Sequence, residues 1–145
     1  PKHLGMVGFF PPLVKKFRAA GQKLTVIEQQ AAFVEKADNF EVTLDATRLA
    51  DCDQVLCTAS TLLNDSLPSI LAHCAEDCFI SLIGPTAGCL PDTLFALGID
   101  EIGASRVVAI DTLIERMQNA EPWGDAVEKY TISAAAYPGW RALLT

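Results

Sequence analysis

Residues 4–12 read LGMVGFFPP, and this stretch decides the fold. Leu4–Gly8 is a short apolar run that ends in glycine, which predicts a buried strand. A turn follows, and Pro12 opens a helix over Leu13–Ala20 because the fixed φ of proline suits the first helical turn. A buried strand followed directly by a helix is typical of the first unit of a parallel α/β sheet.

The same alternation continues along the chain. The further predicted strands are Leu24–Ile27, Asp53–Thr58, Cys78–Ile83 and Ile99–Gly103, and the further helices are Leu67–Cys74, Pro91–Leu97 and Thr112–Asn119, the last capped by Asp111. Two segments, Ala31–Lys36 and Asp45–Ala50, are each interpreted as a helical turn. We therefore predict an α/β, Rossmann-like open sheet, mostly parallel, of about five strands with helices on both faces.

The last segment, Trp123–Thr145, is ambiguous, because Lys129–Ser133 fits an edge strand and a helix is the alternative. Its apolar side chains either pack on the chain's own sheet or dock on another chain, since exposed aromatic residues mark interfaces. These side chains are Tyr137, Trp140, Leu143 and Leu144.

Composition excludes several classes of protein. The chain has 145 residues, of which 50% are hydrophobic and 20% charged, so we expect one folded Rossmann-like domain over residues 1–145. No apolar run approaches the roughly 20 residues of a membrane span. The net charge of −7 argues against a nucleic-acid partner. Five irregularly spaced cysteines without a secretion signal predict a cytoplasmic setting.

The charges are unevenly spread along the chain. Residues 1–23 carry five basic residues and no acid, whereas all 18 acids lie from Glu28 onward. One interpretation is a solvated basic helix face, and the other is a local site for an anion.

The candidate site follows from the sheet, because ligands of open α/β sheets bind beyond the carboxyl ends of the strands. Hydroxyl, amide and small residues gather there, and helix N-termini offer free N–H groups to an anion. Helix capping explains each of these polar residues taken alone. Taken together, they predict a crevice for a small anionic or metal-bearing ligand. The candidate ligand-binding residues are Gly8, Phe10, Pro11, Glu28, Thr58, Ser60, Thr61, Asn64, Gly84, Pro85, Thr86 and Arg106.

Two residues are candidate metal ligands, and a divalent metal is the candidate cofactor. Glu28 directly follows an apolar strand, and its possible roles are metal ligand, general base, ribose partner, or a helix-capping or salt-bridged carboxylate. Cys89 lies in the loop after the predicted fourth strand. Its possible roles are a soft metal ligand, a reactive thiol or a packed loop cysteine. By contrast, His73, Cys74 and Cys78 lack the spacing of a structural zinc site.

Several common chemistries are excluded. The first predicted strand is followed by GFFPP, so the dinucleotide fingerprint G-x-G-x-x-G and the phosphate loop G-x-x-x-x-G-K-[ST] are both absent. An NAD-dependent enzyme is therefore not expected. The histidines, His3 and His73, fall at the opposite edge of the predicted sheet, so a Ser-His or Cys-His pair has no base.

The strand-end residues together resemble the family of putative heavy-metal chelation domains, a family of unknown function. The matching stretches are Val7-Gly8-Phe9-Phe10-Pro11, Val26-Ile27-Glu28, Thr58-Ala59-Ser60-Thr61-Leu62-Leu63-Asn64, Ile83-Gly84-Pro85-Thr86-Ala87 and Gly103-Ala104-Ser105-Arg106-Val107. The chain departs from the usual pattern at Ala59 and Asp65, where glycine is common, and at residues 88–90, which replace a proline-containing segment.

This resemblance implies a Rossmann-like domain that typically follows an N-terminal domain resembling the enolase N-terminal fold, with the site between the two. The first of these domains is expected to be absent here, and the chain, which begins at Pro1, is interpreted as a piece of something larger. The role implied by the resemblance is metal handling or synthesis of a metal-chelating compound.

Three functions fit these observations. The first is a cytoplasmic, Rossmann-like, small-ligand-binding domain. The second is an enzyme of small-molecule metabolism that uses Glu28, although the residues specify no reaction. The third is a non-catalytic subunit that completes its site with a partner, either a second copy of the chain or an enolase-like domain.

Overall fold

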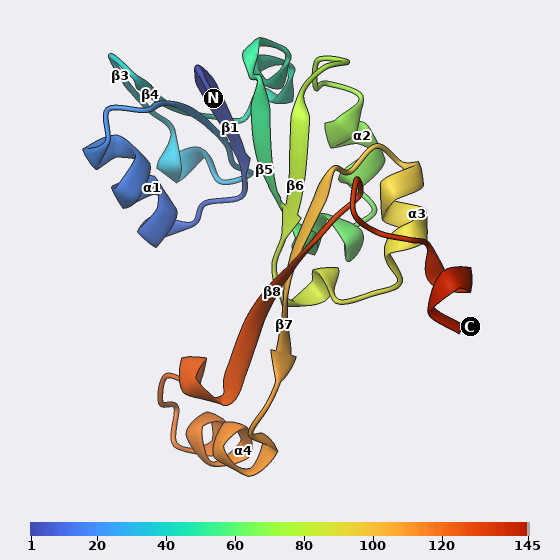
Figure 1. Cartoon of the computed structure of the whole chain (residues 1–145). Coiled ribbons are helices and arrows are strands. Elements are labelled where there is room, and N and C mark those ends of the chain that lie inside the picture. The colour runs from blue at the N-terminus through green and yellow to red at the C-terminus, as the bar shows by residue number, and fades with distance from the viewer. Residues whose placement is uncertain (145) are drawn as a thin grey trace.

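The computed structural model describes residues 1–144, and within them the strands form one sheet (Figure 1). The strands are β1 (His3–Val7), β2 (Lys23–Ile27), β3 (Glu35–Ala37), β4 (Phe40–Thr43), β5 (Gln54–Thr58), β6 (Phe79–Ile83), β7 (Glu101–Val107) and β8 (Val127–Ser133). Their order is β3-β4-β2-β1-β5-β6-β7-β8, parallel throughout except for β3 and β8 at the two edges. The predicted mostly parallel Rossmann-like sheet is confirmed, with eight strands in the described residues instead of about five.

Helices follow the strands in the predicted order. The α-helices are α1 (Pro11–Ala19), α2 (Leu67–Leu71), α3 (Pro91–Ala96) and α4 (Ile110–Gln118), and the 3₁₀ helices are η1 (Ala31–Phe33), η2 (Ala46–Asp51), η3 (Ala59–Leu62), η4 (Pro85–Ala87), η5 (Gly124–Ala126) and η6 (Trp140–Leu144). Asp111 lies in the first turn of α4 and not at its N-cap, which is Ala109. No helix within residues 1–144 has the length and apolar character needed to cross a membrane.

The two strands β3 and β4 were not expected. The segment Ala31–Lys36, predicted as a helical turn, is helical only to Phe33 and then enters β3. β4 is short and alternates between buried and half-buried residues, with Glu41 between Phe40 and Val42. It nevertheless pairs in parallel with β2 and so extends the sheet beyond the expected edge.

The core lies on both faces of the sheet, as predicted. On one face, α1 packs over the central strands through Leu4, Met6, Val14, Leu24, Val26, Phe40 and Val42. On the other face, η2, α2 and α3 pack over the sheet through residues that include Leu49, Val55, Cys57, Leu67, Leu82, Leu94 and Ile102. Alternate residues of β1 and β2 point to opposite faces, so the same two strands contribute to both cores.

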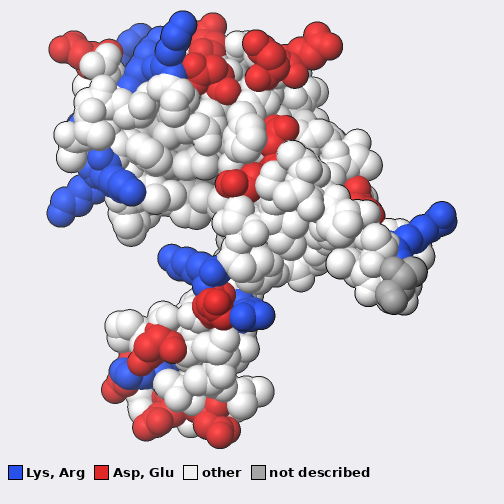
Figure 2. Space-filling view, viewed as in Figure 1, with Lys and Arg blue, Asp and Glu red and all other residues white. Residues whose placement is uncertain are grey.

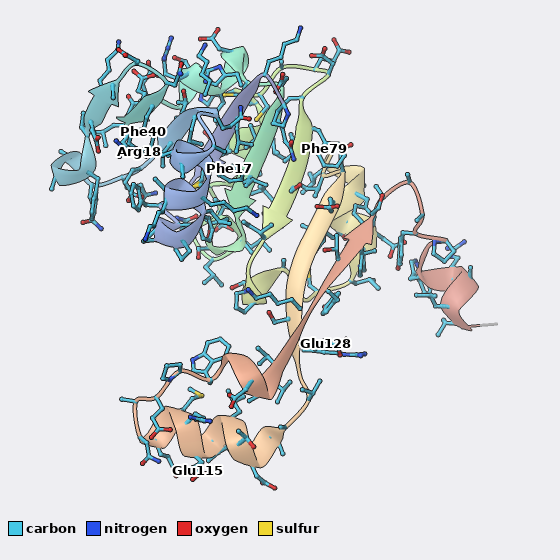
Figure 3. All side chains as sticks on the ribbon, turned by 60° about the vertical axis from the view of Figure 1, so that its left-hand side comes forward. Phe17, Arg18, Phe40, Phe79, Glu115 and Glu128 are labelled. Carbon is cyan, nitrogen blue, oxygen red and sulfur yellow. The ribbon has the colours of Figure 1, made fainter. Side chains whose placement is uncertain are left out.

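Helix α1 explains the basic N-terminal segment. Its exposed side carries Lys15, Lys16 and Arg18. The Arg18 guanidinium lies 4.2 Å from the ring centre of Phe40 (Figure 3) and 3.2 Å from a carboxylate oxygen of Glu35. The charge run is therefore a helix surface that is partly paired with its own chain.

An arm projects from the sheet (Figure 1). β7 and β8 pair over seven residues each and lead into α4 and η5 at the far end. None of the α4 residues is buried, and the side chains of Ile110, Ile114 and Met117 are 65%, 49% and 64% exposed. Figure 2 shows this arm as a separate lobe with acidic residues on its surface.

Gly5, at the centre of β1, lets η2 pack directly on the sheet. A Cβ atom at Gly5 would lie 2.9 Å from Cγ2 of Val55, 3.0 Å from Cδ2 of Leu49 and 3.1 Å from Sγ of Cys52. These separations are shorter than ordinary van der Waals contacts, so a larger residue must push η2 and β5 away.

The substitution Gly5→Ala is therefore expected to lower the free energy of unfolding by about 1–3 kcal/mol, the usual cost of overpacking a core. Urea denaturation measures this difference. The control is Gly124→Ala, because a Cβ atom there meets nothing within 4 Å, and it should change stability by no more than about 0.5 kcal/mol. Equal losses in both variants would contradict this account of η2.

Candidate functional site

A pocket lies where the strand order changes direction. β1 pairs in parallel with β2 on one side and with β5 on the other, so the carboxyl ends of these three central strands lie side by side. The switch-point pocket has a volume of about 550 Å³ and is lined by Val7, Gly8, Ile27, Glu28, Gln29, Leu44, Ala46, Thr58, Ser60, Thr61, Asn64, Ser66 and Ile70. This is the position at which open α/β sheets bind ligands.

Backbone pairing places Gly8 beside Glu28. The Gly8 N–H donates to the carbonyl oxygen of Ile27 at 2.9 Å, and the Glu28 N–H donates to the carbonyl oxygen of Thr43 at 3.0 Å. Gly8 has a φ of +85°, and a Cβ atom there would lie 3.0 Å from Cγ2 of Thr58. Glycine therefore allows the chain to turn away from the sheet where a side chain would collide with Thr58.

Hydroxyl groups line the opposite side of the pocket. The Thr61 hydroxyl donates to the carbonyl oxygen of Thr58 at 2.7 Å, and the Thr58 hydroxyl donates to Oγ of Ser60 at 3.3 Å. Asn64 Oδ1 accepts hydrogen bonds from the N–H and the hydroxyl of Ser66, at 3.2 and 2.6 Å. These bonds hold the loop after β5 and leave the NH₂ group of Asn64 without a hydrogen bond within residues 1–144.

The charge of the pocket comes from Glu28. Among the described residues that line it there is no lysine, arginine or histidine, and Glu28 forms no side-chain hydrogen bond or ion pair within residues 1–144. The start of α1, where Pro11 and Pro12 have no N–H, is not part of the lining and supplies no backbone donor to an anion in this pocket. The pocket is therefore suited to neutral or cationic groups.

The structure brings together six of the predicted site residues. Gly8, Glu28, Thr58, Ser60, Thr61 and Asn64 all line the switch-point pocket. Phe10, Gly84 and Pro85 line a different cavity, described below. Pro11 and Thr86 line neither of these two cavities.

The predicted position of Arg106 beyond the end of a strand is wrong. Gly103–Arg106 was expected to follow a strand, but these residues lie inside β7 and pair with β8. Arg106 is exposed on the arm, where its guanidinium donates to a carboxylate oxygen of Glu128 at 2.7 and 3.0 Å. The strand continues because β8 supplies a partner along its whole length.

Several residues of the switch-point pocket were missed. Leu44 and Ala46 follow β4, the strand that was not predicted, and Ile70 lies on α2. Ser66 and Gln29 are neighbours in sequence of predicted site residues. The alternation of Phe40, Glu41 and Val42 is the signal that identifies β4 and hence the segment that follows it.

A second cavity, the apolar groove, lies between α1 and the base of the arm. Its volume is about 680 Å³, and its lining residues are Phe10, Pro12, Leu13, Ile83, Gly84, Pro85, Gly103, Ala104, Ser105, Pro122, Trp123, Gly124, Val127, Lys129, Tyr130 and Thr131. Because α2 and α3 pack on the other face, no α-helix within residues 1–144 packs over β6, β7 and β8 on this side of the sheet.

The cysteines do not form a metal centre. Within residues 1–144 no three His, Cys, Asp or Glu side chains are grouped so that they could hold a metal ion. Burial raises the pKa of the Cys52, Cys57 and Cys74 thiols to about 11 and that of Cys78 to about 12. Cys89 differs because it is exposed.

His3 is a structural residue. Its side chain is buried, with Nδ1 2.9 Å from the carbonyl oxygen of Asp51 and Nε2 2.9 Å from the Thr25 hydroxyl. Since a carbonyl oxygen only accepts, Nδ1 carries the proton and Nε2 of the neutral ring accepts from Thr25. Burial lowers the pKa of His3, with a smaller contribution from Lys23, and so favours this neutral form.

The tail packs partly on its own chain. The Tyr137 ring contacts that of Phe95 edge to face at 5.5 Å, and its hydroxyl donates to a carboxylate oxygen of Asp92 at 2.8 Å. The Trp140 N–H donates to the other oxygen of Asp92 at 3.2 Å, whereas Leu143 and Leu144 stay exposed. The predicted strand within this segment is confirmed as β8, and Thr145 lies outside the described residues.

The sheet topology and the pocket together define a Rossmann-like fold with a cavity at its switch point. The chain belongs to the DUF364 family, described as putative heavy-metal chelation, whose model matches residues 1–133. The resemblance stated from the strand-end residues is thus confirmed.

The chain is similar to several proteins of known sequence or known structure. An uncharacterized protein of Methanocaldococcus jannaschii is 27% identical over 138 residues, which are 90% of this chain and 52% of that protein. Family members of unknown function from Pyrococcus horikoshii and Desulfitobacterium hafniense superpose with TM-scores of 0.75 and 0.71 at 20% and 24% identity. They cover 92% and 91% of this chain, which spans 55% and 52% of their lengths.

A more distant likeness is to Synechocystis arogenate dehydrogenase. It superposes with a TM-score of 0.57 at 18% identity, over 74% of this chain and 42% of that chain. The likeness shows a common Rossmann-like fold.

Thiol modification tests the cysteine assignment. In the native protein, one thiol, that of Cys89, is expected to react rapidly with a disulfide reagent such as dithionitrobenzoate, because exposure governs access. The buried thiols of Cys52, Cys57 and Cys78 should react at the slower rate of unfolding, and the half-buried Cys74 should react more slowly than Cys89 because its pKa is raised to about 11. Cys89→Ser should abolish the fast phase, and a fast phase that persists in this variant would refute the assignment.

Proposed function

We propose that this domain binds a small organic molecule in the switch-point pocket, in a cytoplasmic process of metal handling or synthesis of a metal-chelating compound. The observation that carries the proposal is the convergence of three strand ends on one cavity with a free carboxylate, hydroxyl groups and an amide. The family description supplies the connection to metal chelation.

The chemistry of the pocket favours an organic ligand over a bare ion. Glu28 is the one carboxylate among the described residues that line the cavity, and Cys89 is not among them. Heavy divalent metals require several nitrogen, sulfur or carboxylate ligands. A metal would therefore arrive as part of a complex that supplies most of its own ligands.

An enzyme that uses Glu28 is the alternative for the same pocket. The carboxylate is half-buried and is not committed to an ion pair within residues 1–144, so it is available as a base. The reaction would depend on the ligand. The binding experiment below tests the ligand site that both the binding domain and the enzyme require.

A second function has support from the apolar groove and the arm. We propose that a second copy of the chain covers them, in keeping with a non-catalytic role for this face. The arm presents the apolar residues Ile114 and Met117 together with the acids Asp111 and Glu115. Lys16 lies one helical turn beyond the groove residues of α1 and would face such acids.

Molecules that co-purify with the protein test the binding proposal. Ala46→Phe places a large side chain in the switch-point pocket, whereas Ala19→Phe places one on the exposed end of α1 as a matched control. Wild type and control should release a small organic molecule on denaturation, and Ala46→Phe should retain about tenfold less, as for a loss of 1.4 kcal/mol. Identical profiles from all three proteins would remove the proposal.

Sedimentation velocity tests the contact between copies. Wild type should self-associate as its concentration rises, and the double variant Ile114→Asp with Met117→Asp should stay monomeric because two charges oppose burial of the arm. Leu63→Asp, at a side chain 73% exposed outside the arm, serves as the control and should associate like wild type. A monomeric wild type would remove this second function and leave the first untouched.

A further inference from the structure

The switch-point pocket has the features of a ribonucleoside site without phosphate recognition. The carboxylate of Glu28 lies at the end of β2, directly after the buried Ile27, and 20 positions after Gly8. In Rossmann folds an acidic residue at this place accepts hydrogen bonds from ribose hydroxyls. Its freedom from other partners within residues 1–144 leaves both oxygens able to accept from a vicinal diol.

The walls of the pocket next to Glu28 suit a flat ring. Ile27 lies beside it on β2, and Leu44 and Ala46 come from the segment after β4. Ile70 on α2 supplies an apolar side chain from a different element. A nucleobase buries its two faces against such aliphatic groups, while its edge remains available to the free NH₂ of Asn64.

Phosphate recognition is missing from the same site. Dinucleotide-binding folds hold the pyrophosphate on the free N–H groups at the start of the first helix. Here no cation is among the described residues that line the pocket, and the start of α1, at Pro11 and Pro12, lies outside this lining and supplies no N–H to it. A phosphate group would also lie in the same cavity as the Glu28 carboxylate and be repelled by it.

We propose that the switch-point pocket binds an unphosphorylated ribonucleoside, neutral or positively charged, through hydrogen bonds from its 2′- and 3′-hydroxyls to the Glu28 carboxylate. This proposal rests on the proposed function of the pocket and names the class of its ligand. The structure carries it through the position of Glu28, the apolar walls and the absence of lysine, arginine and histidine from the described residues that line the pocket.

Calorimetric titration with defined nucleosides tests the proposal. The probes are adenosine and uridine, with 2′,3′-dideoxyadenosine and adenosine 5′-monophosphate as the discriminating pair. At least one ribonucleoside should bind the wild type, the dideoxy compound should bind at least about tenfold more weakly than adenosine, and the monophosphate no more tightly than adenosine.

Variants locate the binding. Glu28→Gln keeps the size of the side chain but removes its charge, so it should weaken adenosine binding about tenfold while the dideoxy compound binds as it does to wild type. Ala46→Phe should abolish binding of both, and Ala19→Phe should have no effect. Equal affinity for the ribose and dideoxy compounds, or tighter binding of the monophosphate, would overturn the proposal.

The two proposals fail in different ways. If neither nucleoside binds but a co-purified molecule depends on Ala46, the ribonucleoside assignment is wrong and the small-molecule site stands. If adenosine binds equally well to Ala46→Phe, both assignments of the pocket are wrong.

Discussion

The parallel register of β1 with its two neighbours is the constraint on which the rest of the structure depends. Val7 aligns with Ile27 of β2 and with Cys57 of β5, so the three strands end at one level. Gly8, Glu28 and Thr58 meet in the switch-point pocket because of this alignment, although Glu28 follows Gly8 by 20 positions and Thr58 follows it by 50. A shift of one residue would turn the buried side chains of β1 to the wrong faces, and burial of both faces therefore maintains the pocket.

The central strands were predictable because burial on both faces requires continuous apolar runs, which are visible in the sequence. The edges of the sheet were not. β3 is fully exposed and carries no apolar pattern, and the pattern of β4 extends over only four residues. β7 was predicted to end at Gly103, because glycine, alanine and serine there are typical of a loop. Its continuation depends on pairing with β8, a contact between distant segments that local pattern does not encode.

The contrast between local pattern and distant contacts also explains which site residues were predicted. Gly8, Glu28 and the residues after β5 lie next to strands recognised from the sequence, so the topology rule was enough to group them. Phe10, Gly84 and Pro85 also follow strands, but they face the apolar groove on the opposite side of the sheet. Which face a loop residue reaches depends on where the next helix packs, and this is decided by tertiary contacts. Leu44 and Ala46 were not predicted as site residues because β4, the strand before them, was not predicted.

The paired prolines at the start of α1 also limit how this domain can change in evolution. A backbone donor cannot be restored by altering a neighbouring side chain, because proline itself lacks the hydrogen. Gaining a pyrophosphate site would require replacing both Pro11 and Pro12, and also shortening the adjacent Phe9 and Phe10 side chains. Restoring both donors in this chain would therefore take two separate substitutions, because neither one supplies both backbone hydrogens alone.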